Sequence, residues 1–249
     1  MPGLSKIRTP FYGIRSIARP LLLILALALL SAHGDNTRSL YVFYPSTTRP
    51  PIVAQKLSER CPGMKVTVFG RYQDFKQRTE SDNPDIIITK PQVLPDLAPY
   101  NGKMRGIRKG AAEEPCVLIS IDKPVQQDSI PLLRIGVVDF LGRTGTERFM
   151  ADLLGAPLNL NRVTKIEDLL PMLTFNKAQA VFVGESAVPY FKKTTLLNLV
   201  ITRLPGCATG IAICATREQT DPDSIKIDLL TIEKNTSTLL EIDQWIPLF

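Results

Sequence analysis

The chain has 249 residues, with 30 Lys and Arg against 24 Asp and Glu, a formal net charge of +6 and one histidine, His33. Four of the basic residues precede residue 20, and without them 26 basic and 24 acidic residues leave a net charge of only +2. This balance gives no support for a nucleic-acid partner. Downstream of His33 the sequence excludes Ser-His-Asp and Cys-His catalytic pairs and an ordinary histidine-containing zinc site. We therefore expect no enzyme, no metal and no cofactor.

The first 34 residues are typical of an export signal. A basic leader without acidic residues precedes the ten-residue apolar run Leu21–Leu30, and the small residues Ala32 and Gly34 come just before Asp35. Ten residues match the apolar part of a signal peptide, whereas a helix that spans a bilayer needs about 20. We expect residues 1–34 to be removed and the chain to be exported to the periplasm; the alternative is an uncleaved membrane anchor.

The remaining 215 residues suffice for one good-sized domain or for two smaller lobes. They contain four cysteines, Cys61, Cys116, Cys207 and Cys214. An even number in an oxidising compartment permits disulfides, and the spacing does not choose among the three possible pairings. Buried free thiols are the alternative.

Short apolar runs alternate with helical patterns along the chain. In a first block we expect strands at 40–44, 65–69, 85–89, 105–108 and 116–121, and helices at 52–60, 72–79 and 91–97. A polar stretch at 122–129 separates this block from a second one. There we expect strands at 133–139, 179–183, 197–201 and 210–215, helices at 144–154, 166–173 and 186–191, and amphipathic segments from 223 to 249. Strands separated by helices predict parallel sheets with crossover helices, here in two α/β lobes.

Ligands of open α/β sheets bind beyond the carboxyl ends of strands, where helix N-termini favour anions. The sequence offers four such positions, with these candidate ligand-binding residues: Tyr44, Ser46 and Thr47; Thr89 and Lys90; Arg143, Thr144, Gly145 and Thr146; and Glu185.

The GRTGT segment at 142–146 is the most informative of the four. Arg143 supplies a forked cation that suits a carboxylate or phosphate, and Thr144 and Thr146 supply hydroxyls at a helix start. The alternative is a capping turn in which these hydroxyls satisfy backbone donors. Lys90 as a solvated charge and Glu185 as a helix-terminal charge are the corresponding alternatives elsewhere. The spacing excludes a P-loop.

Several longer stretches carry a family resemblance: DFKQRTESDNPDIIITKPQVL, RIGVVDFLGRTGTERFMADLLG, IEDLLPMLTFNKAQAVFVGESAVPYF, GIAICATRE and STLLEIDQWIPLF. In order and spacing the chain resembles, over residues 38–249, the type 2 periplasmic solute-binding proteins of ABC transporters. It is most similar to the branch that includes phosphonate- and amino-acid-type binders.

The resemblance implies an α/β fold of two hinged lobes, each a mixed, mainly parallel sheet flanked by helices. Residues 35–120 would begin lobe 1, 121–200 would form lobe 2, and 201–249 would complete lobe 1, with crossing strands near 117–133 and 197–215. By the same resemblance, Thr144 and Thr146 would hold an acidic group of the ligand. Amino-acid binders carry an arginine where this sequence has Thr89 and Lys90, and Arg143 could compensate from the other lobe.

The implied function is reversible binding of a small anionic or zwitterionic solute by a monomer that delivers it to a membrane permease. One alternative is a ligand-sensing partner of a membrane receptor. Another is a degenerate binding or structural module.

Overall fold

The computed structural model describes residues 37–217, 222–237 and 239–248. Residues Arg38–Phe249 form one compact unit, and its strands make two separate sheets. The α/β fold with two lobes and two mixed sheets is therefore confirmed. The expected export signal at 1–34 lies outside the described residues.

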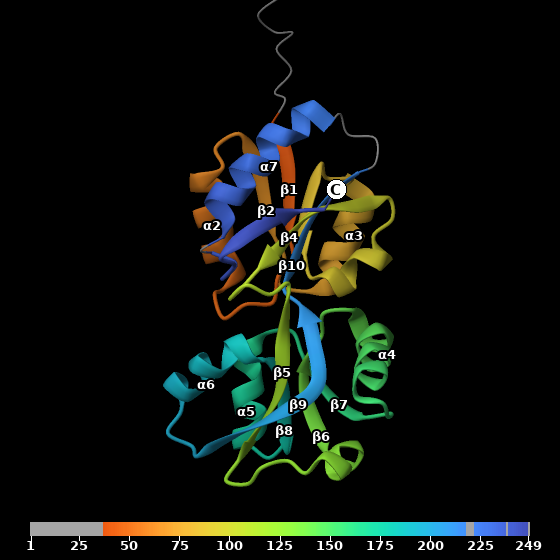
Figure 1. Ribbon diagram of the computed structural model, residues 1–249, viewed down its shortest axis with the longest axis vertical. Helices are drawn as coiled ribbons and strands as arrows, with labels where there is room; N and C mark the ends of the chain where they lie inside the picture. The colour runs from red at the N-terminus through yellow and green to blue at the C-terminus, as the bar shows by residue number, and fades with distance from the viewer. Residues whose placement is uncertain (1–36, 218–221, 238, 249) are drawn as a thin grey trace, which may run out of the picture. The chain divides into compact units, whose positions relative to one another are not determined.

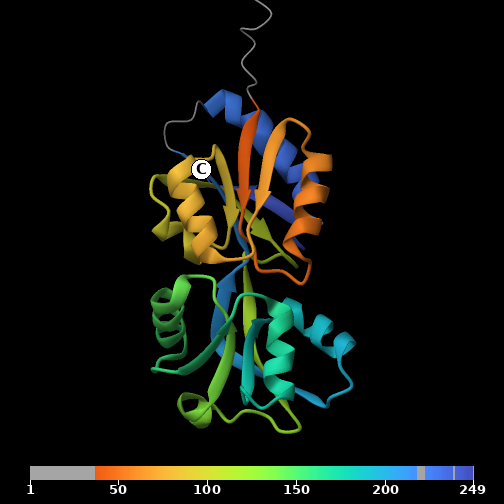
Figure 2. The same cartoon turned by 180° about the vertical axis from the view of Figure 1, so that it is seen from behind.

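Lobe 1 is built on a six-stranded sheet. In spatial order its strands are β11 (Gln244–Pro247), β4 (Tyr100–Ile107), β10 (Ala212–Arg217), β3 (Ile86–Thr89), β1 (Arg38–Val42) and β2 (Met64–Val68). β1 is parallel to β2 and β3, whereas β10 and β11 run antiparallel to their neighbours. The helices of this lobe are α2 (Pro50–Arg60), α3 (Tyr72–Asp82) and α7 (Pro222–Thr236). Figures 1 and 2 show α2 and α3 on opposite faces of the sheet.

Alternate residues of β1 belong to two different cores. Leu40 and Val42 pack on one face of the sheet, and Tyr41 and Phe43 pack on the other. Side chains of a strand alternate between faces, so a sheet covered on both sides needs continuously apolar strands. This requirement explains the unbroken run LYVF in the sequence.

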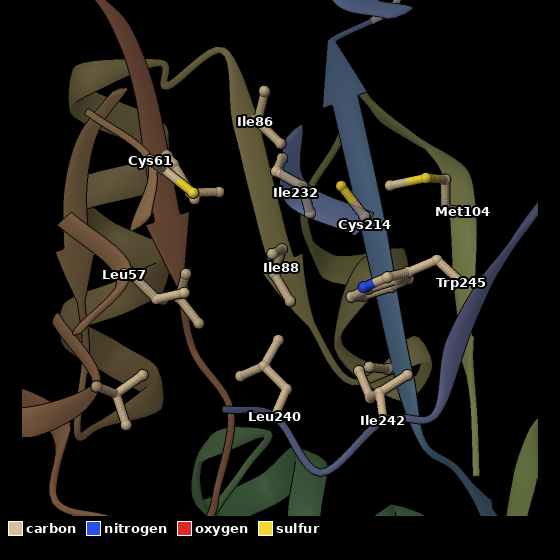
Figure 3. Packing of buried hydrophobic residues seen from close by; sticks show 14 of the residues in the cluster. Leu57, Cys61, Ile86, Ile88, Met104, Cys214, Ile232, Leu240, Ile242 and Trp245 are labelled. Carbon is tan, nitrogen blue, oxygen red and sulfur yellow. The ribbon is translucent and has the colours of Figure 1, made fainter. Parts of the chain in front are cut away.

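The core on the α2 side joins segments that are distant in sequence (Figure 3). Leu57 from α2, Ile88 from β3, Ile232 from α7 and Trp245 from β11 are all buried there. The Trp245 indole N–H donates a hydrogen bond of 3.0 Å to Thr236 Oγ1, which satisfies its only polar group. The C-terminal segment is thus an integral part of lobe 1.

Lobe 2 is built on a five-stranded sheet. Its strands are, in spatial order, β7 (Asn159–Val163), β6 (Arg134–Val138), β8 (Ala180–Gly184), β5 (Glu113–Ile121) and β9 (Leu199–Gly210). The helices are α4 (Gly142–Leu154), α5 (Leu169–Thr174) and α6 (Val188–Thr194), with α4 on one face and α5 and α6 on the other (Figures 1 and 2). β5 is antiparallel to both β8 and β9.

The chain passes between the two sheets twice. The first passage is a tight turn from Arg108 to Ala111, in which Lys109 and Gly110 have φ of 51° and 77°. The second is Ile211, between β9 and β10, whose N–H donates to Ala112 O at 3.0 Å. The two passages therefore lie side by side and are bonded to each other.

The expected lobe boundaries need correction at the level of sheet membership. All of β5 pairs within the second sheet, so the first passage precedes residue 113 and does not lie near 117–133. The polar stretch 122–129 follows the end of β5 and is not the crossing. The second passage lies inside the expected range 197–215, but β9 stays in lobe 2 up to Gly210, beyond the expected boundary at 200.

Two edge strands, β7 and β11, were not expected from the sequence. β7 reads NLNRV, and its asparagines break the apolar run that marks a buried strand. Edge strands need only one neighbour and tolerate such composition. Within the described residues no helix has both the length and the apolarity to cross a membrane.

Candidate functional site

A cleft between the two lobes is the candidate ligand site. It encloses about 720 Å³ of space free of protein atoms, part of it open to solvent. Lobe 1 lines it with Tyr44, Pro45, Ser46, Thr47, Lys90, Arg108 and Glu241, and lobe 2 with Glu114, Val137, Val138, Phe140, Ile166, Phe182, Val183, Gly184, Ser186, Ala187 and Thr209. Most of the lobe 2 residues are apolar.

The polar centre of the cleft is a group of three buried charges, Lys90, Arg108 and Glu114, which we call the interlobe ion cluster. Glu114 Oε1 lies 3.6 Å from Lys90 Nζ, and Glu114 Oε2 lies 3.1 Å from Arg108 Nη1. The three side chains are only 10–14% exposed. Glu114 begins β5 in lobe 2, whereas both cations come from lobe 1, so this cluster ties the lobes together.

Lobe 2 fixes the position of the Glu114 carboxylate. Ser186 donates to Glu114 Oε2 from its hydroxyl at 2.6 Å and from its backbone N–H at 3.3 Å. A Cβ added to Gly184 would lie 2.3 Å from Glu114 Cδ, so only glycine leaves room for the carboxylate. The strand end of β8 and the residues after it therefore form a fitted seat for this side chain.

Arg108 is fully engaged by protein groups. Its guanidinium donates to Tyr44 Oη at 3.1 Å, to Leu240 O at 3.3 Å and to Glu241 O at 2.5 Å, besides its pair with Glu114. A rigid fork held by several acceptors keeps one geometry. Lys90 is less constrained, with Gly210 O at 3.2 Å and the Tyr44 ring centroid at 5.9 Å.

Burial and charge act against each other in this cluster. Burial alone would raise the pKa of Glu114, but Lys90, the bonds from Ser186 and Arg108 together hold it below the ordinary value. Burial lowers the pKa of Lys90, and the attraction to Glu114 opposes this only in part. Burial also raises the pKa of the Tyr44 hydroxyl, which stays a neutral hydrogen-bonding group. The cluster is thus one carboxylate between two cations.

The apolar wall of lobe 2 extends into a contact with lobe 1. Phe140, in the turn after β6, is only 7% exposed and packs in one cluster with Tyr72 and Phe75 of lobe 1. Its ring meets Phe149 of α4 edge-on, with centroids 5.2 Å apart. A Cβ added to Gly142 would lie 3.3 Å from the Tyr72 ring, which shows how closely this turn approaches lobe 1.

Four of the residues expected at the site line the cleft: Tyr44, Ser46, Thr47 and Lys90. The Ser46 hydroxyl donates locally to Thr48 O at 3.0 Å, as the capping alternative expects. Thr89 does not line the cleft. It is fully buried, and its hydroxyl has no hydrogen-bond partner among the described residues.

The turn at 142–146 does not line the cleft, contrary to expectation. Thr146 is fully buried, donates to Asp139 Oδ1 at 2.9 Å and accepts from Leu141 N at 3.2 Å. Arg143 is 76% exposed and pairs with Glu147 at 3.7 Å, and Thr144 is exposed while Gly145 is half-buried. The hydroxyl of Thr146 serves the local turn, which was the alternative interpretation.

Glu185 also lies outside the cleft lining. Its carboxylate pairs with Arg203 at 2.5 Å on the exposed part of lobe 2. The neighbouring residue Ser186 faces the cleft instead, because the turn after β8 directs successive side chains differently.

The sequence analysis missed Arg108, Glu114, Ser186 and Thr209 as cleft residues. A usable signal did exist, since Glu114 directly precedes the apolar run CVLISI and Arg108 ends the preceding strand. A charge at the start of a buried strand is unusual, but only the strand pairing shows that it lies at a passage between lobes.

All four cysteines are buried free thiols, so the disulfides considered for Cys61, Cys116, Cys207 and Cys214 are not formed. Cys116 and Cys207 are in hydrogen-bonding contact between β5 and β9. Among the described residues no group of three or more His, Cys, Asp or Glu side chains could hold a metal ion.

Comparison with known proteins identifies the fold. The sequence matches no protein-family model and no curated protein. The structure is similar to a substrate-binding protein of an amino acid ABC transporter, with a TM-score of 0.55, 12% identity, and coverage of 82% of this chain and 96% of the other. For an arginine-bound ArgBP from T. maritima the TM-score is 0.53, the identity 14%, and the coverage 84% and 99%.

A third similar structure is a double mutant of the BvgS VFT2 domain from Bordetella pertussis. Its TM-score is 0.56 at 14% identity, and the match covers 94% of this chain and 99% of that domain. At such identities the likeness concerns the fold alone. The chain therefore has the two-lobed fold of type 2 periplasmic binding proteins, a class that binds ligands between its lobes.

Proposed function

We propose that this chain is an exported binding protein that holds a small anionic or zwitterionic solute in its interlobe cleft and delivers it to a membrane transporter. The observation that carries the proposal is the presence of two buried cations, Lys90 and Arg108, in a cleft between lobes of this fold. The leader pattern of residues 1–34 supports export to the periplasm.

The cleft also favours a particular kind of solute. Lys90 and Arg108 suit an acidic group, and the apolar wall around Val137, Phe140 and Phe182 suits an apolar body. The titles of two similar structures, an amino acid transporter's binding protein and an arginine-bound protein, support a small charged metabolite. Neither the branch nor the solute follows from fold similarity.

The test is thermal unfolding of residues 35–249, which include the whole compact unit, against amino acids, phosphate, phosphonates, sulfate and carboxylates of increasing chain length. A ligand at 100 times its Kd stabilises a protein by about 2.7 kcal/mol, which shifts the Tm by roughly 5–10 °C for this size. We expect a shift from one class of acids, reduced in Lys90→Met. The absence of a shift from every compound would refute solute binding.

A sensory role is the second candidate, supported by the match to nearly the full length of the BvgS VFT2 domain. In that case the liganded protein, or the domain itself, would act on a membrane receptor. Crosslinking in native membranes distinguishes the two roles, because a transporter partner is a permease and a sensory partner is a receptor. A permease adduct that forms only with ligand would favour transport.

A further inference from the structure

The carboxylate of Glu114 occupies the place in the cleft where the acidic group of a solute would bind. It lies between Lys90 Nζ at 3.6 Å and Arg108 Nη1 at 3.1 Å, and it accepts two hydrogen bonds from Ser186. These are the cations and the donors that line the cleft at this point. Both oxygens are engaged, and the side chain is 10% exposed.

The charges of the cluster show what this occupancy does to the cleft. Without Glu114, two largely buried cations would face the cavity and would attract any small anion. With Glu114 present, one of the two positive charges is compensated, and Glu241 lies 3.7 Å from Arg108 at the rim. The centre of the cleft is therefore close to neutral, although its cations are retained.

The seat of the carboxylate is fitted to it. Gly184 is the one residue type that leaves room for the Glu114 carboxyl, and Ser186 supplies donors from both its backbone and its side chain. Buried charges are costly unless they are paired and hydrogen-bonded, and Glu114 is both. Because Glu114 extends from lobe 2 and both cations extend from lobe 1, its ion pairs hold the lobes together in the way that a bound solute does.

We propose that Glu114 is an internal ligand: its carboxylate holds the lobes together in the absence of solute and must be displaced by the acidic group of an incoming one. The selectivity of the proposed binding function follows from this exchange. A small anion such as acetate gains nothing by replacing one carboxylate with another. A solute whose apolar body also packs on Val137, Phe140 and Phe182 gains that burial in addition, so the cleft selects acids with an apolar body.

The experiment is chemical rescue by acetate in residues 35–249, with Glu114→Ala as the variant. Removing one partner of a buried ion pair should lower the Tm by roughly 10 °C. Acetate should then bind between Lys90 and Arg108 and restore about 5 °C or more at high occupancy. Acetamide, the neutral isostere of acetate, should restore nothing at the same background salt.

Glu185→Ala is the matched control, because Glu185 lies on the same lobe, pairs with one exposed arginine and does not line the cleft. Acetate should not stabilise this control or the wild type. Glu114→Gln keeps the size of the side chain and serves where the alanine variant does not fold. Acetate should stabilise it more than the wild type, because both cations have lost their counter-ion.

The proposal is overturned if acetate and acetamide act alike on both Glu114 variants, or if the wild type responds to acetate as strongly as they do. This outcome is separable from failure of the proposed function. Rescue of Glu114→Ala together with a wild type that binds no acid of the panel would retain the internal ligand and remove the solute. Wild-type binding of an acid without rescue would do the reverse.

Discussion

The two walls of the cleft differ in chemistry. Lobe 1 presents Tyr44, Lys90 and Arg108, whereas lobe 2 presents mainly apolar side chains such as Val137 and Phe182. The exception on lobe 2 is Glu114 with its seat, and this carboxylate meets both cations of the opposite wall. The difference teaches that the lobes are joined by two kinds of contact, a buried ion cluster and an apolar contact at Phe140. The predictions below separate these contacts.

The apolar contact should contribute most to stability. Phe140→Ala removes a ring that is 7% exposed and packs against residues of both lobes. We expect a loss of about 3–5 kcal/mol in the free energy of unfolding, measured by urea denaturation. Phe175→Ala is the control, since that ring is 72% exposed, and it should change stability by no more than about 0.5 kcal/mol. A similar loss in both variants would contradict a specific role for Phe140.

The ion cluster should contribute less per side chain. Lys90→Met removes a charge that burial disfavours, and Glu114 keeps Arg108 and Ser186 as partners. We therefore expect a loss of about 1–2 kcal/mol, because the saved desolvation offsets part of the lost pairing. Lys193→Met, at an exposed lysine of α6, should be near neutral in the same urea titration. A gain in stability in Lys90→Met would mean that lobe 1 retains this lysine for binding alone.

A third variant tests the turn at 142–146, which the cleft does not use. Thr146→Val removes a buried hydroxyl and leaves Asp139 and the Leu141 N–H without this partner. We expect a loss of about 1–2 kcal/mol, whereas Thr144→Val, at an exposed position of the same turn, should be near neutral. Calorimetric titration with any acid that the panel identifies should give equal affinities in both variants. A large loss of affinity in Thr146→Val would contradict the structural role.

The same contrast between lobes shows what the sequence could predict. Buried strands such as β1 and β3 were found because their apolar residues are continuous, and the two-lobed fold follows from the alternation with helices. Edge strand β7 was missed because its pattern depends on a single neighbour. Local pattern therefore predicted the elements but not the passages between the sheets, which long-range pairing determines.

The site was predictable only where a side chain extends directly from a strand end. Lys90, immediately after β3, reaches the cleft as expected. Thr146 has the same sequence logic, but its hydroxyl is closer to Asp139 of its own turn than to any ligand position. Glu114 was missed because its role depends on partners at positions 90, 108 and 186, which no local pattern connects.

The smallest expected effect separates the two turns most directly. Arg143 was the forked cation expected to bind an anion, yet it is 76% exposed and pairs only with Glu147 on its own helix among the described residues. Arg143→Ala should cost about 0.5 kcal/mol or less, because exposed pairs of this spacing contribute little. Arg108→Ala, by contrast, would remove the guanidinium that four protein groups and Glu114 share. Titration of both variants with the same acid decides between the turns: if Arg143→Ala weakened binding more than Arg108→Ala, the anion would bind at the second turn and the interlobe ion cluster would be structural.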